Sequence, residues 1–198
     1  MKDKKVLDDW CEDVLTVGLD EVGIGCGAGP VVTAAVIMPH GFKSPLIRDS
    51  KKLSEKQRNE AYNLIIENAI SFSCNASSIK DINELGINKA TFKTMHKCLD
   101  DLSIKPSVIL VDGNVWEEYN DTKVVLVPKG DDIYTCIAAA AIIAKVRRDE
   151  YMSKLHELFP KYNWKGNKGY LTPDHISALK EFGSNRYHRT QYVKNFVK

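Results

Sequence analysis

Short strand-like runs alternate with helix-like segments along most of this 198-residue chain. Two of the runs, residues 14–19 and 31–38, flank a stretch with glycine at positions 23, 25, 27 and 29. A tight connection of this kind predicts an antiparallel hairpin. Further strands are expected at residues 71–76, 108–111 and 124–127. The alternation predicts an α/β fold with a mixed central sheet flanked by helices.

Helical signals fill the intervals between these runs. Ser54 and Gln57 form a capping box at the start of one segment. Thr172 and Pro173 provide an N-cap and a proline at the first helical position of another. The expected helices cover residues 55–69, 79–102 (one or two helices), 137–159 and 173–183.

The charge of the chain is unevenly distributed. Residues 160–198 carry six lysines and two arginines against Asp174 and Glu181, a net charge of +6, which leaves −4 for the remainder of a chain whose total is +2. Aromatic residues interleaved with these cations suit phosphate contacts and stacking on bases or sugars, although a solvated surface around a small aromatic core is an equal alternative. We predict a main domain over residues 1–159 and a basic helical extension over 160–198 that contacts nucleic acid.

The N-terminal segment and the cysteines indicate the compartment in which the protein functions. The first nine residues carry charge on both sides of their apolar pair, which excludes a secretory signal, and no apolar run approaches membrane-spanning length. Five cysteines lie without a C-x-x-C spacing, which argues against a disulfide framework or a structural zinc site. We expect a cytoplasmic monomer without membrane contact.

Acidic residues follow two of the predicted strands. Asp20 and Glu21 come after the first strand, and Asp112 comes directly after the run at 108–111. Side chains at strand ends converge on one rim of an α/β sheet. Because neighbouring side chains of a strand point to opposite faces, Asp20 and Glu21 both reach one site only if the strand breaks before Gly23.

A fourth acid lies on the long predicted helix. Asp149 continues an apolar stripe, at spacings of four, four, three and three, that should face the sheet. A salt bridge with Lys145, Arg147 or Arg148 is the plain alternative for Asp149 taken alone. Four acids on one rim, however, favour a site for divalent cations such as Mg²⁺, and a pair of such ions supports phosphodiester hydrolysis.

The glycine-rich stretch matches the dinucleotide fingerprint G-x-G-x-x-G/A over residues 23–28. That motif must open a helix, whereas this stretch runs into Pro30 and a strand. Two interpretations of this stretch remain: close backbone approach to a sugar-phosphate chain, or merely a tight hairpin. No metal-binding histidine spacing or nucleophilic serine motif occurs. His175 and His188 can assist at phosphates or be ordinary structural groups.

With these residues in view, the sequence resembles the ribonuclease HII family over nearly its whole length. Separated blocks carry the resemblance in the family's order: residues 18–23 with 28–32, 49–54, 111–113, 129–131 with 137–149, and 168–175 with 188–189.

The resemblance implies a ribonuclease H-like fold with a C-terminal helical extension, and an endoribonuclease that cuts on the 5′ side of ribonucleotides. Its substrates would be RNA/DNA hybrids or duplex DNA containing ribonucleotides, and its cofactor Mg²⁺ or Mn²⁺. The implied metal and catalytic residues are Asp20, Glu21, Asp112 and Asp149. The implied substrate-binding residues are Gly23, Ile24, Gly25, Lys51, Tyr170, His175 and Arg189, with Lys51 on phosphate and Tyr170 on the sugar.

Three departures from the family pattern remove possible phosphate contacts. Ile24 stands where the family has an arginine between two glycines, Ala141 replaces a serine, and residues 132–135 replace an expected lysine and serine. We expect hydrolysis to survive, with altered affinity or junction preference. The alternatives are a hybrid-preferring ribonuclease H with weak incision at single ribonucleotides, or a catalytically weak nucleic-acid-binding module.

Overall fold

The computed structural model of the chain describes residues 6–10 and 14–197. The N-terminal charges within residues 1–5, on which the exclusion of a secretory signal partly depends, and Cys11 lie outside the described residues. No helix in the described part is both long and apolar enough to cross a membrane.

A five-stranded sheet of order β3-β2-β1-β4-β5 forms the centre of the molecule. β1 pairs antiparallel with β2 and parallel with β4, so the predicted mixed sheet and the predicted hairpin are both confirmed. The strands are β1 (Thr16–Val22), β2 (Val32–Ile37), β3 (Ser71–Ala76), β4 (Val108–Asp112) and β5 (Lys123–Val127).

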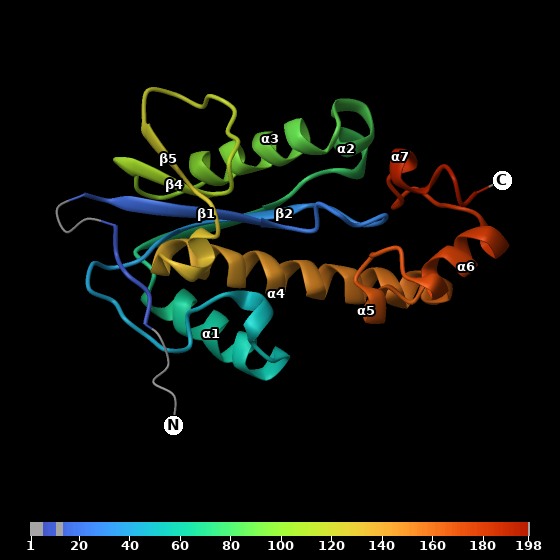
Figure 1. The fold of residues 1–198 in the computed structure, drawn as a ribbon, viewed down its shortest axis with the longest axis horizontal. Helices are drawn as coiled ribbons and strands as arrows, with labels where there is room; N and C mark the ends of the chain where they lie inside the picture. The colour runs from blue at the N-terminus through green and yellow to red at the C-terminus, as the bar shows by residue number, and fades with distance from the viewer. Residues whose placement is uncertain (1–5, 11–13, 198) are drawn as a thin grey trace.

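Helices cover both faces of this sheet (Figure 1). α2 and α3 lie on one face, and α4 with α1 lies on the other (Figure 1). The capping box predicted at Ser54 and Gln57 is present at the start of α1. The helices are α1 (Glu55–Asn68), α2 (Ile79–Leu85), α3 (Ile87–Asp100), α4 (Thr135–Leu158), α5 (Trp164–Asn167), α6 (Pro173–Phe182) and α7 (Thr190–Val193), with 3₁₀ turns η1 (Ser50–Lys52), η2 (Gly130–Asp132) and η3 (Pro160–Tyr162).

β1 and α4 are in close contact because Gly18 has no side chain. A Cβ at Gly18 would lie 2.3 Å from the backbone carbon of Cys136. The alanine-rich first half of α4 is almost wholly buried against the sheet. This close packing places the N-terminal end of α4, and the turn before it, beside the acidic end of β4.

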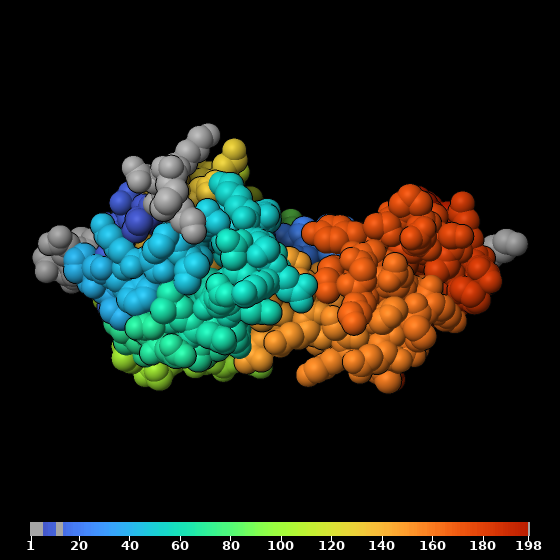
Figure 2. All heavy atoms as spheres, turned by 90° about the horizontal axis from the view of Figure 1, so that it is seen from below, coloured from blue at the N-terminus to red at the C-terminus, as the bar shows by residue number. Residues whose placement is uncertain are grey.

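The C-terminal extension forms a second lobe, separated from α1 by a hollow that exposes α4 (Figure 2). It has a small core of its own, which includes Tyr162, Trp164 and Leu179. The glycine-rich loop between β1 and β2 docks on it: Gly27 N–H donates to Gly169 O at 2.9 Å, and Arg189 N–H donates to Gly27 O at 2.8 Å. The division into domains at residue 159 stays a prediction, because this core also takes side chains from α4.

Candidate active site

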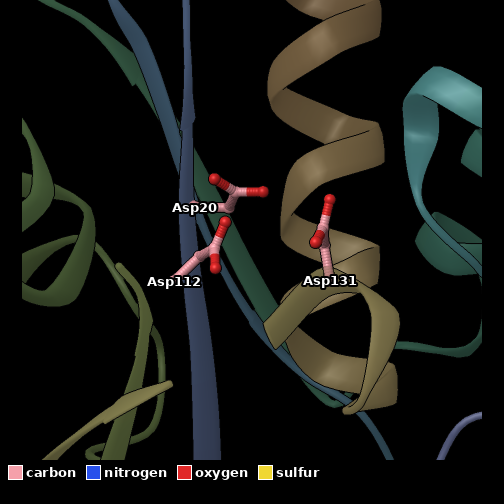
Figure 3. Close-up of side chains that lie close together, drawn as sticks. All are labelled: Asp20, Asp112 and Asp131. Carbon is pink, nitrogen blue, oxygen red and sulfur yellow. The ribbon is translucent and has the colours of Figure 1, made fainter. Parts of the chain in front are cut away.

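Three carboxylates from separate parts of the chain meet at the end of β4. Asp20, Asp112 and Asp131 each offer an oxygen within 4.8 Å of the other two (Figure 3). Asp20 lies on β1 and Asp112 ends its parallel neighbour β4, whose register pairs Leu19 with Val111. Alternation along both strands turns the two aspartates to the α4 face. The predicted meeting of these two acids is therefore present, although Asp20 lies within β1 and not after its end.

Asp131 was not among the predicted site residues. Lys129 adopts a left-handed conformation, and Gly130 N–H donates to Asp112 Oδ1 at 2.8 Å. A Cβ on Gly130 would lie 2.5 Å from Cδ1 of Ile137, so only glycine brings the turn this close to α4. The turn of Lys129, Gly130 and Asp131 is thus hydrogen-bonded to the carboxylate of Asp112 and presents the carboxylate of Asp131 to the site. The available sequence signal for Asp131 was that residues 129–131 form one of the separate blocks that carry the family resemblance.

Burial and mutual repulsion perturb these acids. Burial, reinforced by Glu21 and Asp112, raises the pKa of Asp20 well above its usual value. Burial, together with Asp112 and Asp49, also raises the pKa of Asp131. A group of crowded oxygen ligands held in this way is relieved by a hard divalent cation, and the residues fit Mg²⁺ or Mn²⁺.

Glu21 adjoins the group from the other face of the sheet. β1 does not break at the acids, since Glu21 still pairs with Thr33 of β2, so the predicted strand break is wrong. Its side chain lines a pocket with Ile24 and with Phe92 of α3. Burial, followed by the charge of Asp112, raises the pKa of Glu21 to about 7. Glu21 is therefore electrostatically coupled to the carboxylate group without being one of its three members.

Asp149 lies apart from this group, contrary to the predicted shared rim. Lys145 Nζ contacts both of its carboxylate oxygens, at 2.5 and 2.7 Å, and Arg58 Nη1 lies 3.8 Å from Oδ2. Successive helical residues are about 100° apart. Arg148 takes the position facing the glycine-rich loop, which turns Asp149 toward α1. The structure therefore shows Asp149 in a salt bridge, as the plain alternative predicted.

Lys51 lies beside the acidic group on the solvent side. It sits on η1, where Asp49 Oδ1 accepts a hydrogen bond from Lys51 N at 2.9 Å. Its Nζ lies 3.8 Å from Asp131 Oδ2, and its side chain is 80% exposed. Burial alone would lower the pKa of Lys51, but the charges of Asp131 and Asp49 outweigh this effect, so the pKa is raised. The ammonium group is charged and accessible at the edge of the site.

The glycine-rich loop and Tyr170 lie side by side next to the acids. A Cβ at Gly25 would be 3.9 Å from Cε1 of Tyr170, whose side chain is half exposed. Gly23 has a φ of +106° and rests directly on Arg148, leaving no room for a side chain. The loop thus presents backbone, with Ile24 exposed at its tip.

The structure does not place His175 and Arg189 where they could contact substrate directly, because both are 0% exposed. His175 Nε2 accepts from Trp164 Nε1 at 3.1 Å, and His188 Nε2 lies 3.2 Å away. Burial lowers the pKa of His175, and burial together with His175 lowers the pKa of His188 to about 4. These histidines form part of the core of the extension, the ordinary alternative considered for them.

Comparison with known proteins agrees with this arrangement. The sequence model of the family described as ribonuclease HII matches residues 17–195. The chain belongs to the ribonuclease HII family. It is 44% identical to ribonuclease HII of Bacteroides thetaiotaomicron, over 91% of this chain and 90% of that protein. The corresponding protein of Christiangramia forsetii is 45% identical, over 94% of each chain. Ribonuclease HII of Archaeoglobus fulgidus, solved in complex with PCNA, superimposes with a TM-score of 0.76 at 27% identity, covering 90% of this chain and 95% of that one.

Family membership confirms the ribonuclease H-like fold and an enzyme of the ribonuclease H type. Two of the departures from the family pattern can now be placed. Ile24 is exposed and lines a pocket with Glu21 and Asp112, so its position is open to solvent. Ala141 is buried in α4, so no contact with substrate is lost from that position.

Proposed function

We propose that the chain is a metal-dependent endoribonuclease that hydrolyses the phosphodiester on the 5′ side of ribonucleotides, in RNA/DNA hybrids or embedded in duplex DNA. The observation that carries the proposal is the convergence of Asp20, Asp112 and Asp131 within 4.8 Å, beside a loop of exposed backbone. Cleavage leaves a 3′-hydroxyl and a 5′-phosphate.

In this proposal Asp20, Asp112 and Asp131 hold Mg²⁺ or Mn²⁺, with Glu21 as a further carboxylate at the edge. Bound divalent ions would activate water and stabilise the leaving oxygen of the phosphodiester. Asp131 takes the role that the helical stripe had predicted for Asp149. The contacts of Asp149 support a structural role instead, because its partner Arg58 also donates to the carbonyls of Ser50 and Leu53 around Lys51.

Recognition of the ribonucleotide falls to the neighbouring groups. Only the 2′-hydroxyl distinguishes RNA from DNA at such a site, and a close backbone contact can read it. We assign that contact to the loop at Gly23 and Gly25, the stacking contact to Tyr170, and the phosphate contact to Lys51. The exposure of Tyr170 and Lys51 supports these assignments. His175 and Arg189 act behind this surface.

A cleavage assay with three matched duplexes tests the proposal. One duplex carries a single ribonucleotide, one has an entire strand of RNA, and one is all DNA. We expect incision of the first two with Mg²⁺ or Mn²⁺, no incision in EDTA, and none of the DNA duplex. Failure to cut either ribonucleotide substrate with both metals, from neutral to alkaline pH, refutes the proposal.

The exposed Ile24 favours one alternative, a hybrid-preferring ribonuclease H. An isoleucine at this position cannot pair with a phosphate, so incision at a single ribonucleotide would be weak relative to incision of the hybrid. The ratio of the two rates in the same assay separates these readings. A catalytically weak nucleic-acid-binding module is the remaining alternative, and it predicts duplex binding with little or no incision under any metal condition.

We further propose that the chain acts as a monomer in the cytoplasm. A reducing compartment is supported by the cysteines that the structure describes, which are all free thiols: Cys26, Cys74, Cys98 and Cys136. Sedimentation of the purified protein tests the monomeric state.

A further inference from the structure

Two arginine side chains beneath the glycine-rich loop, Arg148 and Arg189, are completely buried. Their guanidinium groups donate to five backbone carbonyls, and neither forms an ion pair with a carboxylate within the described residues. Arg148 donates to the carbonyls of Pro30, Ala28 and Lys168, and so ties α4 to both the loop and the extension. A buried cation without a counter-ion is costly. Because of this cost, we expect buried arginines of this kind where they have a structural task, such as holding the backbone in one conformation.

The tip of the loop is a β-turn with a choice of two conformations. Cys26 N–H donates to Gly23 O at 3.3 Å, which makes Ile24 and Gly25 the central residues. The peptide between two such residues can face either way, and glycine at the third position readily permits the form with positive φ. Gly25 is nevertheless absent from the glycines that have positive φ. The turn therefore does not take the form with positive φ, and the contacts of the Ile24 carbonyl show which way this peptide faces.

Arg189 contacts this peptide directly. Its Nη1 donates to Ile24 O at 2.7 Å, and its Nε donates to Gly29 O at 3.0 Å, so the guanidinium spans the tip and the base of the loop. In a planar trans peptide the carbonyl and the following N–H point in opposite directions. With Ile24 O turned inward to Arg189, the Gly25 N–H is directed outward. Gly25 and Ile24 are the exposed residues of the turn.

We propose that Arg189 is a positioning residue, which holds the peptide between Ile24 and Gly25 so that the Gly25 N–H donates to the 2′-oxygen of the bound ribonucleotide. This rests on the proposed function and adds a group that selects the sugar without touching it. The loop conformation then depends on a buried side chain from the extension and not on the side chain at position 24. Because the loop conformation does not depend on the side chain at position 24, an isoleucine there is compatible with the proposed contact.

Arg189 remains a cation at neutral pH, since burial lowers its pKa only to about 10. The ring of Tyr192 lies beside it, with the guanidinium carbon 5.5 Å from the ring centroid. The planar fork of an arginine can serve two carbonyls at once, whereas a lysine ammonium is a single point donor. Lysine at position 189 should therefore restore part of the function that glutamine loses.

Binding in EDTA, where no cleavage takes place, tests the role of Arg189. The quantity measured is the ratio of affinities for a duplex with one ribonucleotide and for the same duplex in all-DNA form. We expect this preference to fall roughly three- to tenfold in Arg189→Gln, the factor expected for one hydrogen bond, and to recover in part in Arg189→Lys. Arg186→Gln, an exposed arginine of the same extension, is the matched control and should keep the wild-type ratio.

A wild-type preference that persists in Arg189→Gln overturns the inference. Wild-type protein that neither prefers nor cuts the ribonucleotide refutes the proposed function instead, so the two failures are distinct. Because Arg189→Gln can fail to fold, the amide resonance of Gly25 is also followed in the wild-type protein. We expect it to shift with the ribonucleotide duplex and not with the all-DNA duplex. An equal response to both duplexes overturns the inference without any variant.

Discussion

Replacing Glu21 with glutamine should stabilise the metal-free protein at neutral and alkaline pH while impairing catalysis. Burial and the charge of Asp112 raise the pKa of Glu21 from 4.5 to about 7. One pKa unit corresponds to about 1.4 kcal/mol, so ionised Glu21 costs the folded state at most about 3 kcal/mol. Glutamine keeps the shape of the side chain and removes that cost.

The sign of the effect follows from proton binding. Between pH 4.5 and 7 the folded protein holds a proton on Glu21 that the unfolded chain has released, so the contribution of Glu21 to stability is present below pH 4.5 and lost as pH rises through 7. The difference in free energy of unfolding between Glu21→Gln and wild type should therefore be near zero at pH 4. It should grow to about 3 kcal/mol by pH 8, on the order of 6–12 °C in Tm.

Urea unfolding in EDTA at a series of pH values measures this difference, with Glu60→Gln, an exposed glutamate of α1, as the matched control. Added Mg²⁺ should stabilise the wild type more than Glu21→Gln, because binding to the folded state alone raises its stability. A pH-independent difference, or destabilisation by Glu21→Gln at pH 8, refutes the electrostatic account of the site.

Three further predictions concern the surroundings of the site. Since burial and His175 lower the pKa of His188 from 6.5 to about 4, the unfolded chain gains a proton first as pH falls, and up to about 3 kcal/mol of stability should be lost between pH 6.5 and 4. Urea unfolding should show a shallower pH dependence in His188→Asn, and equal slopes would contradict this. Gly18→Ala places a Cβ 2.3 Å from the backbone of α4, so thermal unfolding should show a loss of about 3 kcal/mol or more; an unchanged Tm would contradict the contact. Tyr170→Ala should raise KM for the single-ribonucleotide duplex roughly tenfold, because removal of an aromatic stacking contact with nucleic acid costs about 1–3 kcal/mol, while an unchanged KM would remove Tyr170 from the binding surface.

Local patterns in the sequence were sufficient for most of the fold. The hairpin, the capping box at Ser54 and the long helix each depend on neighbouring residues, and each is present. Asp112 could be found because it ends a strand, which is a local signal, and Asp20 because it lies on the parallel neighbour of that strand.

The errors concern tertiary contacts. Asp131 reaches the site because Gly130 fits against Ile137 and donates to Asp112, and no periodicity in the sequence encodes that fit. Asp149 was placed by a helical stripe, yet a stripe resolves direction only to within about one residue. The neighbouring Arg148 took the inward position because it satisfies three carbonyls of the loop and the extension.

The central claim is that Asp20, Asp112 and Asp131 form the metal site of this member of the ribonuclease HII family, and a single comparison tests it most directly. Cleavage of the single-ribonucleotide duplex in saturating Mg²⁺ is measured for Asp131→Asn and for Asp149→Asn, with folding of each checked by thermal unfolding. The account predicts that Asp131→Asn lowers kcat by at least about a hundredfold, on the scale of removing a catalytic electrostatic group, while Asp149→Asn stays within about threefold of wild type and loses roughly 1 kcal/mol of stability. Near-normal cleavage by Asp131→Asn, with loss of cleavage in a folded Asp149→Asn, would contradict it.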